Sequence, residues 1–99
     1  MSGSDEKIIV ENINTPGRTS RVNAEKYSAM RNALISAFDS TKTPLTQAQM
    51  VETVKPQLPE HLFPEGKTSG WWVKTVQLDL EAKGILRRLK TKPLTWTLV

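Results

Sequence analysis

The sequence predicts an α+β fold in which three helices are followed by a C-terminal β-hairpin. Apolar residues recur every three or four positions in three stretches before Gly84, and after it they alternate with polar residues. The length of 99 residues suits one hydrophobic core and leaves no room for a second. We therefore expect a disordered tail at residues 1–7 and a single domain at residues 8–99.

An extended segment precedes the first helix. Residues 7–13 carry β-branched side chains in near alternation, and Pro16 and Gly17 then favour a turn. This pattern indicates one short strand, which can add a third strand to the C-terminal hairpin.

The first two helices have clear boundary signals. Asn23 is a suitable N-cap for a helix at residues 24–38, whose apolar side chains fall on one face. Thr46 and Gln49 have the spacing of a capping box at the start of the second helix. Pro56 ends that helix because proline lacks a backbone donor, and the loop that follows is pinned to the core by Leu62 and Phe63.

The third helix carries two apolar stripes. Thr68 or Ser69 can cap it, and Gly84 can end it in a left-handed conformation after Lys83. One stripe consists of Trp72, Val73, Val76 and Leu80, and the other of Trp71, Leu78 and Ala82. Two polar strips lie between them, one with Gly70, Lys74, Gln77 and Glu81 and one with Thr75, Asp79 and Lys83. A helix with two apolar sides is expected to pack against neighbours on both.

The C-terminal hairpin pairs residues 85–89 with residues 94–99 around a turn at residues 90–93. The order of elements is therefore β-α-α-α-β-β. We expect the core to consist of Tyr27, Met30, Leu34, Phe38, Val51, Val54, Trp72, Val76, Leu80, Ile85, Leu94, Trp96 and Leu98.

Three helices followed directly by a hairpin resemble a winged helix. Residues 80–86, Leu-Glu-Ala-Lys-Gly-Ile-Leu, resemble the passage by which many winged-helix proteins leave the third helix and enter the wing. Three further passages, at residues 16–19, 62–64 and 70–84, resemble a small bacterial family of winged-helix-like domains with no assigned biochemical function. The resemblance implies a winged helix over nearly the whole chain and leaves the activity open. The connection between the second and third helices is longer than in ordinary helix-turn-helix units, and this departs from the pattern that docks the third helix in a major groove.

The positive charge of the chain lies in its last third. Residues 67–99 hold seven Lys and Arg against two Asp and Glu, whereas residues 1–66 hold seven against eight. Clustered cations favour a polyanionic partner, and we expect double-stranded DNA to contact the hairpin and the third helix. The candidate nucleic-acid-binding residues are Lys67, Ser69, Lys74, Gln77, Arg87, Arg88, Lys90 and Lys92. The alternative is a hairpin whose charges only prevent strand-to-strand aggregation.

Two apolar residues raise a different possibility, a protein-interaction or homodimer surface. We expect Trp71 to pack beneath the hairpin against Trp96 or Leu89. If it is exposed instead, Trp71 marks an interface with a protein partner or a second copy, and Leu78 extends that surface if the hairpin leaves it uncovered.

The sequence argues against an enzyme, a cofactor and a metal site. There is no Cys, and His61 is the only histidine and has no nucleophile or metal-ligand companions. Asp79 and Glu81 are two residues apart, so they diverge on a helix and do not form a catalytic pair. Arg18 and Arg21 flank a turn and can bind an anion, or pair with Glu11 or Glu25. With no apolar run long enough for a membrane span and no signal peptide, we expect a cytoplasmic protein.

Overall fold

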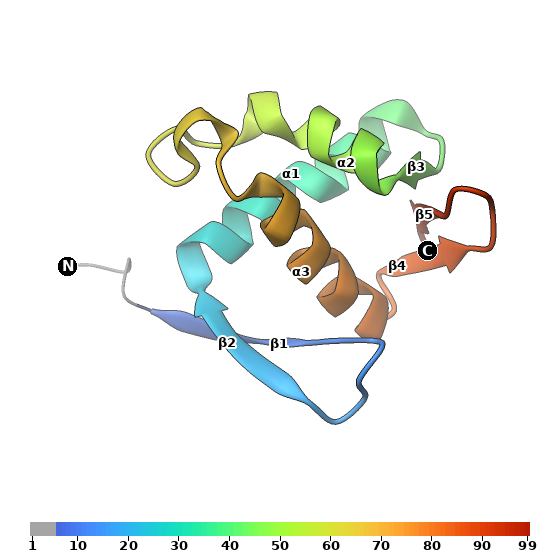
Figure 1. The fold of residues 1–99 in the computed structure, drawn as a ribbon, viewed down its shortest axis with the longest axis horizontal. Helices are drawn as coiled ribbons and strands as arrows, with labels where there is room; N and C mark the ends of the chain where they lie inside the picture. The colour runs from blue at the N-terminus through green and yellow to red at the C-terminus, as the bar shows by residue number, and fades with distance from the viewer. Residues whose placement is uncertain (1–5) are drawn as a thin grey trace.

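A computed structural model describes residues 6–99, and helix α3 (Ser69–Ala82) lies at its centre (Figure 1). Helices α1 (Ala24–Thr41) and α2 (Gln47–Val54) pack against α3 and against each other. The strands form two small antiparallel sheets, which makes the fold α+β as predicted. A disordered tail was expected at residues 1–7. Residues 1–5 lie outside the described residues, and Lys7 already belongs to the first strand.

The first sheet is an N-terminal hairpin of β1 (Lys7–Glu11) and β2 (Thr19–Asn23). Val10 and Val22 are its buried side chains, and Gly17 turns the chain with a φ of 88°. The prediction that the first strand joins the C-terminal hairpin is wrong, because β1 pairs with β2 alone among the described strands.

The second sheet has the strand order β3-β5-β4. Its edge strand β3 comes from the connection between α1 and α2. Strand β3 (Leu45–Thr46) pairs with β5 (Thr95–Leu98), which in turn pairs with β4 (Leu86–Leu89). We refer to β4 and β5 with their connecting turn as the C-terminal hairpin. Because Leu45 stands opposite Trp96, strand β3 ties this hairpin to the helical layer.

The signals predicted for α1 and α2 are confirmed. The Asn23 side chain accepts a hydrogen bond from the Lys26 backbone N–H at 2.9 Å, and α1 runs three residues past its predicted end. At the start of α2, Gln49 N–H donates to Thr46 Oγ1 at 3.1 Å and Thr46 N–H donates to Gln49 Oε1 at 2.9 Å. Pro56 lies in the short 3-10 helix η2 (Lys55–Gln57) that terminates α2.

A long connection leads from η2 to α3 and contains a second 3-10 helix, η3 (Pro64–Gly66). Phe63 anchors this connection as predicted, since its ring is buried and contacts Trp72 edge-on at 6.2 Å between centroids. The predicted side-chain cap of α3 is wrong. Thr68 has a φ of 62° and makes no capping hydrogen bond to the described residues, while Ser69 Oγ donates to the Gly66 carbonyl at 2.6 Å.

Gly84 ends α3 in the left-handed region, as predicted, with a φ of 76°. Its reversal lets Ile85 N–H donate to the Leu80 carbonyl at 2.8 Å and sends the chain into β4. Most of the predicted core is buried, and three of its members are only partly buried against it: Val51, Ile85 and Leu98. Leu94 is exposed because it lies in the turn before β5 begins, and Leu86 is buried in β4.

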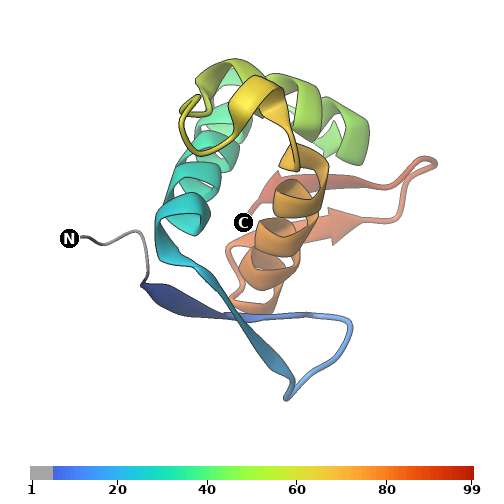
Figure 2. The same ribbon diagram turned by 60° about the vertical axis from the view of Figure 1, so that its left-hand side comes forward.

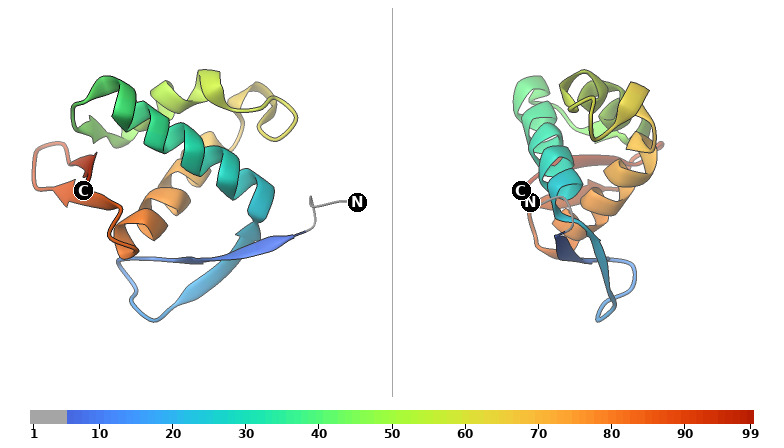
Figure 3. Two further views of the ribbon diagram at one scale, coloured as in Figure 1. Left: turned by 180° about the vertical axis from the view of Figure 1, so that it is seen from behind. Right: turned by 90° about the vertical axis from the view of Figure 1, so that its left-hand side faces the viewer.

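Both hairpins project to the same side of α3. Figure 2 shows the turn between β1 and β2 below the C-terminal end of α3 and the turn between β4 and β5 to the right of α3. The two further views in Figure 3 show the same arrangement from behind and from the side. The outer side of α3 therefore lies between two β-arms.

Candidate functional site

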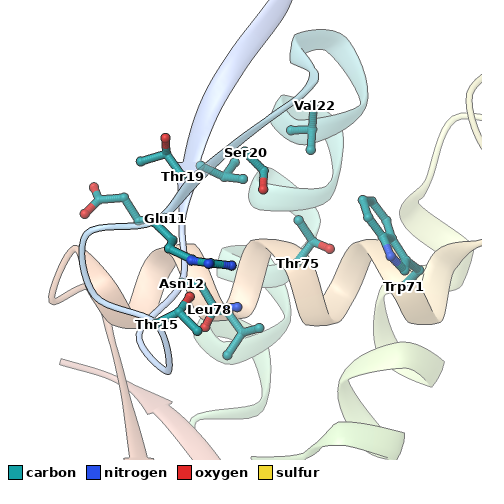
Figure 4. A pocket seen from close by; sticks show the side chains of 11 residues that line it. Glu11, Asn12, Thr15, Thr19, Ser20, Val22, Trp71, Thr75 and Leu78 are labelled. Atoms are coloured by element: carbon teal, nitrogen blue, oxygen red, sulfur yellow. The ribbon is translucent and has the colours of Figure 1, made fainter.

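The outer side of α3 is hollowed where it meets the N-terminal hairpin. The hollow has a volume of about 310 Å³, and Figure 4 shows its side chains reaching from β1, β2 and α3. We call it the Trp71 hollow; its lining consists of Val10, Glu11, Asn12, Thr15, Arg18, Thr19, Ser20, Val22, Trp71, Thr75 and Leu78. Residues that are distant in sequence thus meet there because the N-terminal hairpin lies along α3.

A second hollow, of about 350 Å³, lies between α3 and the C-terminal hairpin. It is lined by Asn14, Gln47, Lys74, Gln77, Leu78, Arg88, Leu94 and Trp96. Leu78 lines both hollows, so they meet along α3. Gln77 Oε1 and Trp96 Nε1 are buried here without a hydrogen-bond partner among residues 6–99.

The buried Asp79 carboxylate fastens the N-terminal hairpin to α3. Asp79 Oδ1 accepts a hydrogen bond from the Glu11 backbone N–H at 2.8 Å, and Lys83 Nζ lies 2.7 Å from the same oxygen. The Tyr27 hydroxyl donates to Asp79 Oδ2. Burial and the adjacent carboxylate both raise the pKa of Tyr27, so the phenol stays protonated and remains a donor.

The Glu81 carboxylate makes the matching connection to the C-terminal hairpin. Arg88 donates from Nε to Glu81 Oε1 at 3.1 Å, and Gln77 Nε2 donates to Glu81 Oε2 at 2.8 Å. The Arg88 guanidinium also lies 5.5 Å from the centroid of the Trp96 ring. Arg88, a predicted nucleic-acid contact, is therefore a half-buried ion-pair partner of Glu81.

Two more predicted nucleic-acid contacts are inaccessible. Gln77 is only 2% exposed because it lies between Glu81 and the C-terminal hairpin, and Ser69 is buried at the start of α3. By contrast, five predicted cations are exposed and form no ion pair with any residue from 6 to 99: Lys67, Lys74, Arg87, Lys90 and Lys92.

Trp71 is 58% exposed, so the expectation that it packs beneath the C-terminal hairpin is wrong. Its ring meets Trp72 at 5.1 Å between centroids with a T-shaped geometry, and its remaining surface borders the Trp71 hollow. Leu78 is only 8% exposed, so it offers no surface patch of its own.

The sequence marked Arg18 as a residue that can bind an anion, but it did not reveal the hollow that the N-terminal hairpin forms with α3. Arg18 lines the Trp71 hollow and pairs with neither Glu11 nor Glu25 in the described chain. The turn signal at Pro16 and Gly17 was visible in the sequence. The placement of that turn against α3, however, depends on the contact between Glu11 and Asp79, 68 positions apart.

Other kinds of site find little support in residues 6–99. No group of three or more His, Cys, Asp or Glu side chains there is arranged to hold a metal ion. His61 is exposed, and its Nε2 lies 3.7 Å from Glu25 Oε2. None of the helices in this part of the chain combines the length and hydropathy that a bilayer span requires.

Comparison with known proteins gives one finding. A model of a family of unknown function (DUF6958) matches residues 7–96. No curated protein and no protein of solved structure matches the chain significantly.

Proposed function

The chain belongs to this family of unknown function, DUF6958, and we propose that it is a winged-helix module that binds nucleic acid and has no catalytic activity. The strand order β3-β5-β4 supports the winged-helix assignment, because β3 lies between α1 and α2 and makes the C-terminal hairpin a wing attached to the helical layer. The resemblance of residues 80–86 to a helix-to-wing junction agrees with the left-handed Gly84.

The observation that carries the binding proposal is the state of the basic side chains. The wing exposes Arg87, Lys90 and Lys92, the connection before α3 adds Lys67, and α3 itself adds Lys74. An exposed cation without an ion-pair partner is free to neutralise a phosphate, and each such contact releases counterions. These five residues are the proposed phosphate contacts.

The mode of binding differs from ordinary reading of a major groove. Gln77 and Ser69 are buried, and the two hairpins flank the outer side of α3. Contacts to phosphate therefore dominate, and we expect high affinity for nucleic acid with little discrimination among base sequences.

The test is the anisotropy of a fluorescent random-sequence duplex at two salt concentrations. If all five cations contact phosphates, a fourfold rise in salt weakens binding roughly 500-fold. The double variant Lys90→Glu/Lys92→Glu should bind weakly. The matched control Lys7→Glu/Lys55→Glu changes the net charge equally at exposed sites away from the wing and should bind nearly as well as the parent chain. Affinity that is insensitive to salt and to the wing variant would overturn the proposal.

The exposure of Trp71 favours a second candidate, a protein-interaction or homodimerisation module. Tryptophan is enriched at the centre of protein interfaces, where it supplies a large apolar area. This candidate predicts a mass in sedimentation that rises with concentration and returns to the monomer value in Trp71→Ala. A monomer at all concentrations speaks against the homodimer.

A further inference from the structure

We propose that the Trp71 hollow binds an unpaired nucleobase together with its phosphate, so that the preferred partner contains a single-stranded segment. The inference rests on the proposed nucleic-acid-binding function and names its substrate class. It assigns a role to the one large aromatic side chain of α3 that the core does not use.

The first step is the stacking surface. Trp71 is held from one side by Trp72 at 5.1 Å, yet 58% of it remains exposed. A base that leaves its stack can stack again on such a ring, whichever of the bases it is. A base inside an intact duplex is already covered on both faces and cannot.

The second step is the chemistry around the ring. Arg18 brings a guanidinium into the hollow, and Lys74 lies one helical turn beyond Trp71 on α3. The hydroxyl groups that line the hollow belong to Thr15, Thr19, Ser20 and Thr75. Cations and hydroxyls beside an aromatic ring suit a nucleotide, whose phosphate is anionic and whose base carries donors and acceptors.

The third step concerns the acidic residue at the hollow. Glu11 would repel a phosphate if its carboxylate pointed inward. Figure 4 shows that carboxylate directed away from Thr75 and Trp71, on the far side of β1. The backbone N–H of Glu11 donates to Asp79, which holds this end of β1 against α3. The volume of about 310 Å³ falls within the range of small-ligand sites.

The fourth step concerns the other side chains of α3 that could reach a nucleic acid. Gln77 and Leu78 are covered, so α3 offers few side chains to the base edges of a duplex. Lys74 lines the second hollow together with Leu94 of the wing, and that hollow shares Leu78 with the Trp71 hollow, so a strand held at the wing can continue along α3 to Trp71. The geometry therefore favours a strand with splayed bases over a closed duplex.

The experiment compares a fluorescent oligo(dT) with a blunt duplex of the same length, for the full chain and three variants. We expect the parent to bind oligo(dT) at least as tightly as the duplex, with quenching of tryptophan fluorescence. Trp71→Ala should weaken oligo(dT) binding by about 10- to 100-fold and leave duplex binding nearly unchanged, because stacking on one base is lost. Trp71→Phe should recover most of the affinity.

Ile9→Ala is the matched control, since Ile9 is an exposed apolar residue of β1 that does not line the hollow. It should bind both probes like the parent, and urea unfolding should show that all variants are folded. Oligo(dT) affinity unaffected by Trp71→Ala overturns this inference, while salt-dependent duplex binding would still support the proposed function. If neither probe binds, both proposals fail. If free thymidine monophosphate binds as tightly as oligo(dT), the hollow is a mononucleotide site and the single-strand assignment is wrong.

Discussion

At the scale of single residues, Asp79 shows how a polar position on a helix can be central to a fold. Its spacing puts it on a polar strip of α3, but its carboxylate is fully buried. Three different donors satisfy it: the Tyr27 hydroxyl, the Lys83 ammonium and the Glu11 backbone N–H. A buried charge is tolerated only when it is paired and hydrogen-bonded in this way.

Removal of this carboxylate should be strongly destabilising. Asp79→Ala leaves Tyr27 and Lys83 without their acceptor, and we expect the free energy of unfolding to fall by about 3–5 kcal/mol. Tyr27→Phe removes one hydrogen bond to a charged group and should cost about 2 kcal/mol. Asp39→Ala is the control, because Asp39 is exposed and only 4.0 Å from Lys42 in a surface pair; its effect should stay below roughly 0.5 kcal/mol. Urea unfolding followed by circular dichroism measures all three. Equal losses for Asp79→Ala and Asp39→Ala would contradict this account.

At the scale of elements, the two glycines at the ends of α3 should respond oppositely to a methyl group. Gly70 lies in the first turn of α3 with open space where a Cβ atom would point, whereas Gly84 has a φ of 76°. Gly70→Ala should stabilise the protein by about 0.5 kcal/mol through helix propensity. Gly84→Ala should destabilise it by about 1–2 kcal/mol because an L side chain resists the left-handed region. Thermal unfolding of both variants tests the pair, and a shift of the same sign in both would be inconsistent with these backbone roles.

The elements also show which parts of the fold a sequence can reveal. The three helices and the C-terminal hairpin were predictable because their periodicity, the Asn23 and Thr46 caps and Gly84 are local signals. Strand β2 was missed because Val22 is its only apolar residue, so no alternation marks it. Strand β3 was missed because two residues carry no period, and only their pairing with β5 defines them.

The candidate site also has features that the sequence predicts and features that depend on how distant segments pack. Exposure of Lys74, Arg87, Lys90 and Lys92 was predictable, since Lys and Arg rarely lie buried without a partner. The burial of Gln77 was not, because it depends on where the C-terminal hairpin folds back against α3. Nor was the exposure of Trp71, which results from the N-terminal hairpin leaving a hollow beside the ring instead of filling it.

At the scale of the whole molecule, α3 holds the two β-arms through two carboxylates that point in different directions. Asp79 and Glu81 are two positions apart, so their side chains diverge around the helix. Asp79 binds the backbone of β1, and Glu81 binds Arg88 of β4. Glu11, the partner of Asp79, lines the Trp71 hollow, and Arg88, the partner of Glu81, lines the second hollow, so each hollow adjoins one of the two carboxylate contacts.

Amide hydrogen exchange should distinguish the contact of Asp79 with β1 from the contact of Glu81 with β4. In Asp79→Asn, the amides of β1 and β2 should exchange about 10-fold faster while those of β4 and β5 change little, because a charged hydrogen-bond acceptor at the N-terminal hairpin is weakened. In Glu81→Gln, the faster exchange should instead lie in β4 and β5. The two variants change the net charge equally, and each therefore serves as the control for the other. Equal acceleration of both hairpins in either variant would mean that the two hairpins open as one unit, so that a ligand bound at the C-terminal hairpin would also alter the Trp71 hollow.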